Sequence, residues 1–416
     1  MTGSLLMLLA ACAPSGFSEP DRADTGTGPG ALTLRWVPVA GEPWEQALQG
    51  LWWSLAGLGA SPEPGAVEVL ARDGRTVTYT LDPEALGLRE RSLRALLAAV
   101  EPLEAARQRQ GMAWIDTGRL LQRTLYEPWV YYAVTGACET LEGPSARLGA
   151  TAAVAGITDS LLTDGDRRIL FRKDIRRIED IMWLAEGGEG SILEGDFEPR
   201  GVETVDVMPN GRFRYAIYDE DGLLAPVADA EHTPAGQPGR CMWCHENHLM
   251  TGIAQVDVPG LTPHGEFLEA VDAQQARVEA LRSSLSGPID WQTHAVHAWS
   301  EVLVEGFLSP PTARLADEWG LPASTVEAWM SEAGIVSERN EEYPDWGPVW
   351  RRSDADAVLQ QRRPDVDASS PLAGTDGAPL AVLPSARTLD DPGEAFFLPP
   401  APHACAGTGA PASRFE

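Results

Sequence analysis

The sequence predicts an α+β fold, in which a mixed region of strands and helices leads through a β-hairpin into a mostly helical region. Two observations predict this class. Segments of alternating apolar and polar residues, flanked by turn signals, lie in the first half of the chain. After residue 260, apolar residues recur instead at helical spacing. We therefore expect a mixed region over residues 31–224 and a mostly helical region over residues 225–358.

The first part of the mixed region alternates between strands and helices. The pair Asp73-Gly74 lies between two β-type segments and is a strong hairpin signal. Pro102 is expected either to end its helix or to kink it, with Leu103–Gln108 as the continuation beyond the kink, because the proline ring clashes with the preceding turn. The predicted strands are Ala31–Val39, Ala66–Ala71 and Thr76–Leu81, and the predicted helices are Glu42–Leu58 and Glu90–Val100.

The second part of the mixed region contains an aromatic-rich segment and the clearest hairpin. The segment Trp114–Tyr132 could wall a ligand pocket, but such clusters more often belong to a core. Small and apolar residues favour helices over Ala150–Leu162 and Ile175–Leu184. The turn Pro209-Asn210-Gly211 joins two alternating segments. These expected hairpin strands are Val202–Met208 and Phe213–Tyr218.

Helices are expected to make up most of the C-terminal region. Ser324 and Glu327 have the spacing of a capping box, which predicts a helix start. Residues 312–334 imitate a helix-turn-helix DNA reader. However, the segment in the place of the recognition helix lacks Lys and Arg, so we exclude DNA binding. The predicted helices are His264–Ser283, Trp291–Phe307, Thr312 to about Trp319, and Ser324–Ala333.

One short stretch near the start of this region has a chemical signature. Cys241, Cys244 and His245 form the pattern C-x-x-C-H, in which one helical turn separates the two cysteines. In this pattern each thiol can add to a vinyl group of haem, and the histidine can bind the iron. The five residues resemble the attachment motif of c-type cytochromes. The resemblance implies one covalently bound haem c, with His245 as the proximal iron ligand.

Two other uses of a C-x-x-C pair are weighed against this interpretation. A zinc site needs two more ligands, and the thiols left for it, Cys138 and Cys405, lie far away in the sequence. A thioredoxin-like pair opens a helix directly after a strand, whereas a Gly- and Pro-rich loop, Pro234–Gly239, precedes this motif. The spacing therefore favours haem attachment. Cys138 and Cys405 are expected either to form a disulfide or to remain separate thiols.

The distal ligand of the iron is not identified by the motif. His294 and His297 lie three residues apart, so they would share one face of a helix. Met330 is a further candidate on a later helix. A methionine ligand would raise the reduction potential of the haem, whereas a second histidine would generally lower it.

The N-terminus predicts export, which haem c attachment requires. An apolar run ends in Leu9-Ala10-Ala11-Cys12, which resembles the lipobox of bacterial lipoprotein signal peptides. The resemblance implies a signal peptide over residues 1–11 and a lipid anchor on Cys12, although the usual basic residues before the apolar run are missing. Residues 12–30 are expected to be a flexible linker, and residues 359–416 a disordered tail.

Charge restricts the partners of the chain. The net charge is −29, with 61 acidic and 32 basic residues, and this balance argues against nucleic acid and against an acidic redox partner.

The expected function is electron transfer with an unidentified redox protein. The chain is expected to be a lipoprotein of the cell envelope that faces the periplasm or lies in the outer membrane. The alternative is a haem enzyme or a gas or redox sensor with an open distal site. A lysine cross-link, as in c-haem enzymes that oxidise hydroxylamine, could use only Lys173. A structural role for the haem is a third interpretation.

Overall fold

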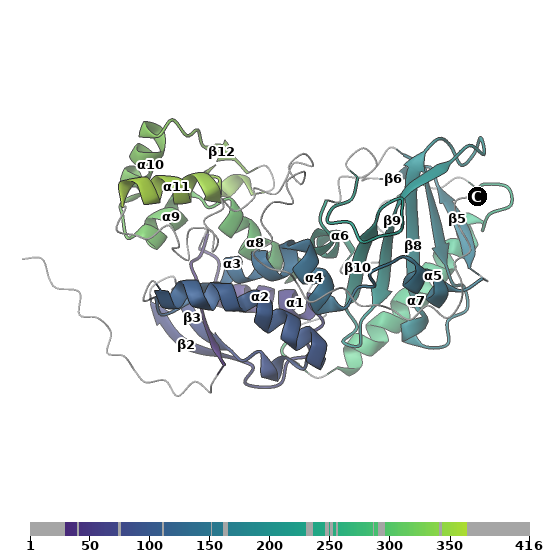
Figure 1. The fold of residues 1–416 in the computed structure, drawn as a ribbon, viewed down its shortest axis with the longest axis horizontal. Helices are drawn as coiled ribbons and strands as arrows, with labels where there is room; N and C mark the ends of the chain where they lie inside the picture. Colours follow the sequence, from purple (N-terminus) through teal and green to yellow (C-terminus); the bar gives the residue numbers. More distant parts are fainter. Residues whose placement is uncertain are drawn as a thin grey trace, which may run out of the picture.

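The computed structural model describes residues 30–363, apart from residues 40, 74–75, 110–111, 151, 161–164, 230–235, 246–248, 250–252, 255–256, 286, 290–295 and 341–342. It contains both sheets and helices, which confirms the α+β class. Figure 1 shows three parts: a small sheet covered by helices, a larger sheet with helix α7 along it, and a group of C-terminal helices. The expected signal peptide, linker and lipidated Cys12 lie outside the described residues, except for Gly30.

The first part is a four-stranded sheet in the order β2-β3-β1-β4. Its strands are β1 (Leu32–Trp36), β2 (Val67–Asp73), β3 (Thr76–Leu81) and β4 (Ile115–Asp116). Strands β2 and β3 pair antiparallel, which confirms the first predicted hairpin. The helices are α1 (Trp44–Gly57), α2 (Glu90–Arg109), α3 (Thr117–Leu121) and α4 (Pro128–Thr135), with a 3-10 turn η1 (Glu84–Leu86) and a π-helical turn η2 (Gln122–Tyr126). Helix α2 continues through Pro102, because Val100 and Leu103 on either side are buried in the core.

The second part is a five-stranded antiparallel sheet in the order β10-β9-β8-β7-β5. Its strands are β5 (Ala153–Ile157), β7 (Arg167–Phe171), β8 (Met182–Glu189), β9 (Glu198–Val207) and β10 (Phe213–Tyr218). Short elements beside it are α5 (Glu142–Leu148), the 3-10 turn η3 (Ile178–Asp180), and the paired strands β6 (Asp159–Ser160) and β11 (Ile253–Ala254).

Two helix predictions in this part were wrong. Residues 150–162 contain β5 and β6, and residues 175–184 contain η3 and the start of β8. In both cases pairing with neighbouring strands outweighs local helix propensity: Ala153 pairs with Phe171, and Leu184 lies between Leu170 and Thr204 in the sheet.

The β9–β10 hairpin is confirmed, and its turn is anchored to the first part of the molecule. Phe213 pairs with Val207, and Gly211 in the turn has a φ of 76°. The side-chain amide of Asn210 donates hydrogen bonds of 2.8 Å to the carbonyl oxygens of both Ala56 and Ala60, at the end of α1. The turn therefore fixes the larger sheet against the helices that cover the smaller one.

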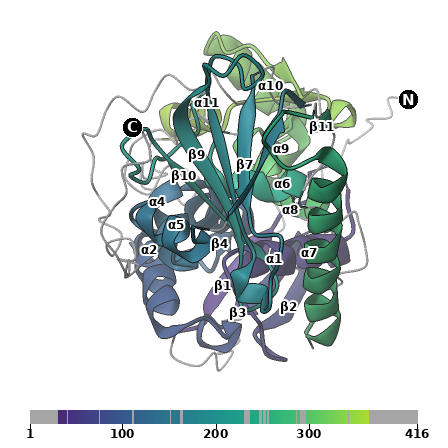
Figure 2. The same cartoon turned by 90° about the vertical axis from the view of Figure 1, so that its right-hand side faces the viewer.

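Helices flank both faces of the larger sheet (Figure 2). On one face lies α7 (His264–Ser284), whose Phe267 contacts the stacked rings of Phe171 and Trp183. On the other face lies α5, whose Arg147 forms an ion pair with the buried Asp206 of β9. Strand alternation thus divides the sheet into an apolar face and a face with buried charges.

The C-terminal part consists of α8 (Val296–Leu308), α9 (Thr312–Trp319), α10 (Ala323–Glu332) and α11 (Arg352–Arg362), with short elements β12 (Glu338–Arg339), η5 (Pro344–Trp346) and β13 (Pro348–Val349). Helix α8 packs on α1 and α3, and α9–α11 surround a second hydrophobic cluster. The predicted capping box was wrong, because α10 begins at Ala323 after Pro322 without a side-chain cap.

The first four residues of the expected tail are helical. Residues 359–362 belong to α11, because Val358 and Leu359 are buried in the second cluster. Residues 364–416 lie outside the described part of the chain. The main hydrophobic core includes residues from Leu32 to Val304, so it draws on both expected regions. Within the described ranges, none of the helices has the length and apolar character needed to cross a membrane.

Candidate haem-attachment site

The C-x-x-C-H stretch forms a short helix, α6 (Cys241–His245), directly after the 3-10 turn η4 (Pro238–Arg240). Positions 241, 244 and 245 are separated by three and four residues, so they fall on one face of this helix. Cys241 and His245 are half-buried. The side chain of Cys244 is outside the description, although its backbone lies in α6.

Close packing fixes the position of α6. A β-carbon at Gly239, in η4, would overlap the carbonyl oxygen of Leu125, so only glycine allows this approach to η2. The side chain of Met242 is 2% exposed and lies against Gly57 of α1. Figure 1 shows that α6 lies between the helices of the first part and the edge of the five-stranded sheet. The motif is therefore held where two parts of the molecule meet.

Tyrosines of α4 cover the edge of the sheet beside the motif. β10 is an edge strand, whose outward N–H groups need partners. The N–H groups of Tyr215 and Ile217 donate hydrogen bonds of 3.2 Å to the hydroxyl oxygens of Tyr131 and Tyr132, respectively. The aromatic-rich segment is thus largely core, as predicted. Burial raises the pKa of both α4 tyrosines, and the nearby Cys241 raises it further. The same tyrosines therefore also lie near the motif.

The aromatic ring of Tyr215 lies beside the histidine of the motif. Its ring centroid lies 6.1 Å from that of His245, with the two rings tilted by 36°. Tyr215 is 2% exposed, and its hydroxyl has no hydrogen-bond partner among the described residues. Burial raises the pKa of Tyr215, so the hydroxyl keeps its proton. A buried hydroxyl without a partner costs about 1–3 kcal/mol, so the hydroxyl of Tyr215 calls for an explanation.

Two buried arginines also lie near Tyr215. Arg212 is 0% exposed and stacks on Trp53, with its guanidinium carbon 3.9 Å from the ring centroid. Arg282 of α7 donates a 2.8 Å hydrogen bond from Nε to the carbonyl oxygen of Gly211. Burial lowers the pKa of both arginines, for Arg282 to about 10, and the neighbouring Arg282 lowers that of Arg212 further. The hairpin therefore brings positive charge close to Tyr215.

Of the three candidate distal ligands, Met330 is the one whose side chain the structure describes. His294 lies outside the described residues, and the structure describes only the backbone of His297, in the first turn of α8. Met330 is 0% exposed and packs in the second hydrophobic cluster with Trp319 and Val326, a cluster that contains no residue of α6. The structure thus brings together His245 and Tyr215, but it does not place Met330 with them.

The structure also describes two other residues named in the sequence analysis, Cys138 and Lys173. Cys138, which follows α4, is 5% exposed and disulfide-bonded, with a partner sulfur outside the description. Cys405 lies outside the described residues. Lys173 forms a 2.6 Å ion pair with Glu266 of α7. Among the described residues, no group of three or more His, Cys, Asp or Glu side chains is arranged to hold a metal ion.

The partner of Cys138 can be tested by peptide mapping. We expect it to be Cys405, because Cys12 is predicted to carry lipid and Cys244 to carry haem. Mass spectrometry of a non-reduced digest should then contain a peptide that links residues 138 and 405, and this peptide should disappear on reduction. A Cys138–Cys244 peptide in protein that also contains covalent haem would contradict the prediction.

Sequence reasoning identified the motif but not its surroundings. The hairpin pattern places Phe213, Tyr215 and Ile217 on one face, but it does not indicate that Tyr215 meets a helix some thirty residues later. Nor does any local signal identify Arg212 and Arg282 as buried, because arginine is usually exposed. No protein-family model, curated protein or solved structure matches this chain.

Proposed function

We propose that this protein is a membrane-anchored, monohaem c-type cytochrome that transfers electrons in the bacterial cell envelope. The observation that carries the proposal is the C-x-x-C-H sequence on α6, a helix with half-buried Cys241 and His245 at its two ends. Helical spacing places positions 241, 244 and 245 on one face of α6, as thioether attachment and iron ligation require. A one-electron carrier needs no further catalytic group.

The surroundings of His245 fit a haem ligand. When a histidine binds a metal through Nε2, its Nδ1–H usually donates a hydrogen bond that fixes the orientation of the ring. The ring of Tyr215 lies beside that of His245, and its buried hydroxyl is our candidate acceptor for such a bond. The haem would supply reversible electron uptake when bound. Cys241 and Cys244 would hold it, and His245, supported by Tyr215, would bind the iron.

The decisive experiment is the visible spectrum of protein produced with a cytochrome c maturation system. The spectrum is recorded for the oxidised protein, the reduced protein, and the reduced protein under carbon monoxide. A sharp α band after reduction that does not change with carbon monoxide is the expected result, because two strong axial ligands leave no open position. Absence of covalent haem would refute the proposal. A carbon monoxide shift would favour the alternative, an enzyme or sensor with an open distal site.

Replacing Tyr215 with phenylalanine should raise the reduction potential. Loss of an acceptor for Nδ1–H makes the imidazole a weaker electron donor, which destabilises the ferric form. A hydrogen bond of about 1 kcal/mol corresponds to about 40 mV for one electron. Spectroelectrochemical titration of the haem-loaded protein measures this shift.

The control for this variant is Tyr218→Phe on the same strand. The Tyr218 hydroxyl already has a partner, because it donates a 3.0 Å hydrogen bond to the Cys138 carbonyl. Its removal should leave the potential unchanged. Equal potentials for Tyr215→Phe and wild-type protein would show that Tyr215 does not support the iron ligand.

Replacing Cys12 with alanine should release the protein from membranes. The acyl chains expected on Cys12 provide the anchor, because each buried methylene adds about 0.8 kcal/mol of membrane affinity. Immunoblots of soluble and membrane fractions from cells that express the full chain measure the effect. Cys405→Ala serves as the control and should remain in the membrane fraction. Membrane retention of Cys12→Ala would argue against the lipid anchor.

A further inference from the structure

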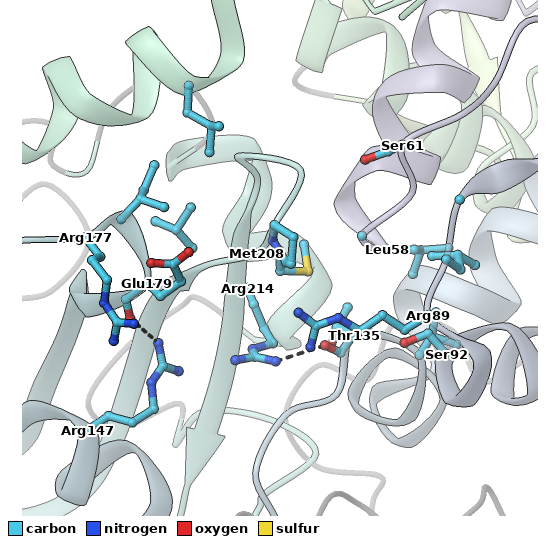
Figure 3. Close-up of a pocket in the computed structure, with 18 of the residues that line it drawn as sticks. Leu58, Ser61, Arg89, Ser92, Thr135, Arg147, Arg177, Glu179, Met208 and Arg214 are labelled. Atoms are coloured by element: carbon cyan, nitrogen blue, oxygen red, sulfur yellow. Dashed lines mark hydrogen bonds between the residues drawn. The ribbon is translucent and has the colours of Figure 1, made fainter. Parts of the chain in front are cut away.

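A cavity of about 650 Å³ lies where the helices of the first part meet the β9–β10 hairpin (Figure 3). Lining residues come from the end of α1, the start of α2, the end of α4 and η3, as well as from the hairpin. No residue of η4 or α6 is among those that line it. The volume falls within the range of small-molecule sites. The lining includes the apolar side chains of Leu58, Leu88, Val134, Ile178 and Met208.

The lining is also rich in arginine. Four arginines from separate parts of the chain line the cavity, and Figure 3 shows them on both sides of it: Arg89, Arg147, Arg177 and Arg214. The carboxylates of the lining are Glu179 and Asp180. The wall therefore carries an excess of positive charge, in a chain whose net charge is −29. A concave, positive surface of this kind attracts and concentrates anions.

Two of the arginines are held rigidly by a buried carboxylate. Arg214 donates a 2.9 Å hydrogen bond from Nε to Asp206 and bonds of 3.0 and 2.8 Å from Nη1 to the carbonyl oxygens of Thr135 and Gly136. Arg147 binds the same Asp206. Burial alone would raise the pKa of Asp206, but the two arginines lower it, so the carboxylate stays ionised. Asp206 offsets one of these two charges, and the base of the cavity stays positive and ordered.

The other two arginines lie at the rim. The side chain of Arg177 is 74% exposed and approaches Asp180 at 3.5 Å. Arg89 is exposed and directly precedes α2, whose first turn contributes Ser92 to the lining. The positive end of the helix dipole adds to the attraction for an anion at this point. Both rim side chains can therefore reach a bound anion without breaking a buried contact.

We infer that this cavity binds a small organic anion, with its apolar body against the apolar side chains of the lining and its carboxylate among the arginines. The combination of apolar side chains and excess guanidinium groups matches an amphipathic acid better than a purely inorganic ion or a neutral lipid. This binding site is independent of the proposed haem, because no lining residue belongs to the motif.

Calorimetric titration of the full chain with octanoate tests the inference. We expect saturable binding to the wild-type protein and at least tenfold weaker binding to the double variant Arg89→Gln/Arg177→Gln. Both rim side chains are exposed, so the fold should persist, and circular dichroism checks this. The matched control is Arg200→Gln, an arginine that pairs with Glu189 and Glu198 outside the cavity. This control should bind octanoate like the wild type.

Two further titrations define the ligand class. Octanol has the same apolar chain without the charge, and inorganic phosphate has the charge without the chain. Both should bind at least tenfold more weakly than octanoate. The inference is overturned if octanoate does not bind saturably, if the double variant binds it as tightly as the wild type, or if either octanol or phosphate binds equally well.

Discussion

Replacement of His245 with alanine, or of both Cys241 and Cys244 with serine, is expected to abolish normal haem attachment. The two thioether bonds form through the thiols, and the imidazole provides the proximal iron ligand, so the variants lose either the covalent bonds or the ligand field. The double cysteine variant should lose all covalent haem. His245→Ala should lose the spectrum of a low-spin cytochrome even if a thioether forms.

The measurement is covalent haem per protein, from haem staining of denatured gels and the pyridine haemochrome spectrum. Met242→Leu is the matched control, because it lies within the motif but packs toward Gly57 and provides neither a thiol nor an iron ligand. It should retain the wild-type haem content. A double cysteine variant with wild-type covalent haem content would refute the assignment of the motif. A folded but colourless Met242→Leu protein would show that packing of α6 itself limits attachment.

Local sequence signals predicted tight turns and hairpins, but not strands whose formation depends on distant partners. The β9–β10 hairpin was predictable because Asn210-Gly211 favours a tight turn and the flanking residues alternate. Residues 150–162 were misassigned because their small side chains permit both helix and strand, and pairing with β7 decides between them. Such pairing is set by residues elsewhere in the chain, which a local pattern does not contain.

Some residues of the candidate site were likewise predictable from local sequence, and others were not. Cys241, Cys244 and His245 were predictable because attachment chemistry fixes their spacing within one helical turn. Tyr215 was not, because its relation to His245 depends on how the hairpin packs beside α6. The cavity depends even more on tertiary structure, since Arg89 and Arg214 are more than a hundred residues apart. These side chains become a site only when the two sheets and their helices are assembled.

Assembly of the C-terminal helices depends on a buried charge cluster. Glu318 of α9 accepts 2.6 Å hydrogen bonds from Arg314 Nε and Arg352 Nη1. Arg314 also forms a 2.9 Å ion pair with Asp116, at the start of α3, and Arg352 Nε donates a 2.8 Å bond to the carbonyl of Phe307. The side chains of Arg314, Glu318 and Arg352 are each at most 1% exposed. The cluster therefore joins α9 and α11 to α3 and α8.

Replacing Glu318 with alanine should destabilise the protein by about 3–5 kcal/mol, because it leaves two buried guanidinium groups without their shared carboxylate. Chemical denaturation at neutral pH, followed by tryptophan fluorescence, measures this loss. Glu332→Ala is the control: Glu332 pairs with Arg362 at the surface, where the side chains are 60% and 35% exposed. The control should cost less than about 1 kcal/mol. Equal effects of the two variants would show that the buried cluster contributes no more than a surface ion pair.

The same cluster predicts a dependence of stability on pH. Burial alone would raise the pKa of Glu318, but Arg352 and Arg314 lower it from 4.5 to about 2. A carboxyl group whose pKa is lower in the folded state stabilises the fold above its unfolded pKa. The contribution of Glu318 should therefore be complete above about pH 5 and decline as the pH falls from 4.5 toward 2. Glu318→Gln should lose this part of the dependence, so its stability should approach that of the wild type as the pH falls. A constant difference between Glu318→Gln and wild type across this range would contradict the lowered pKa.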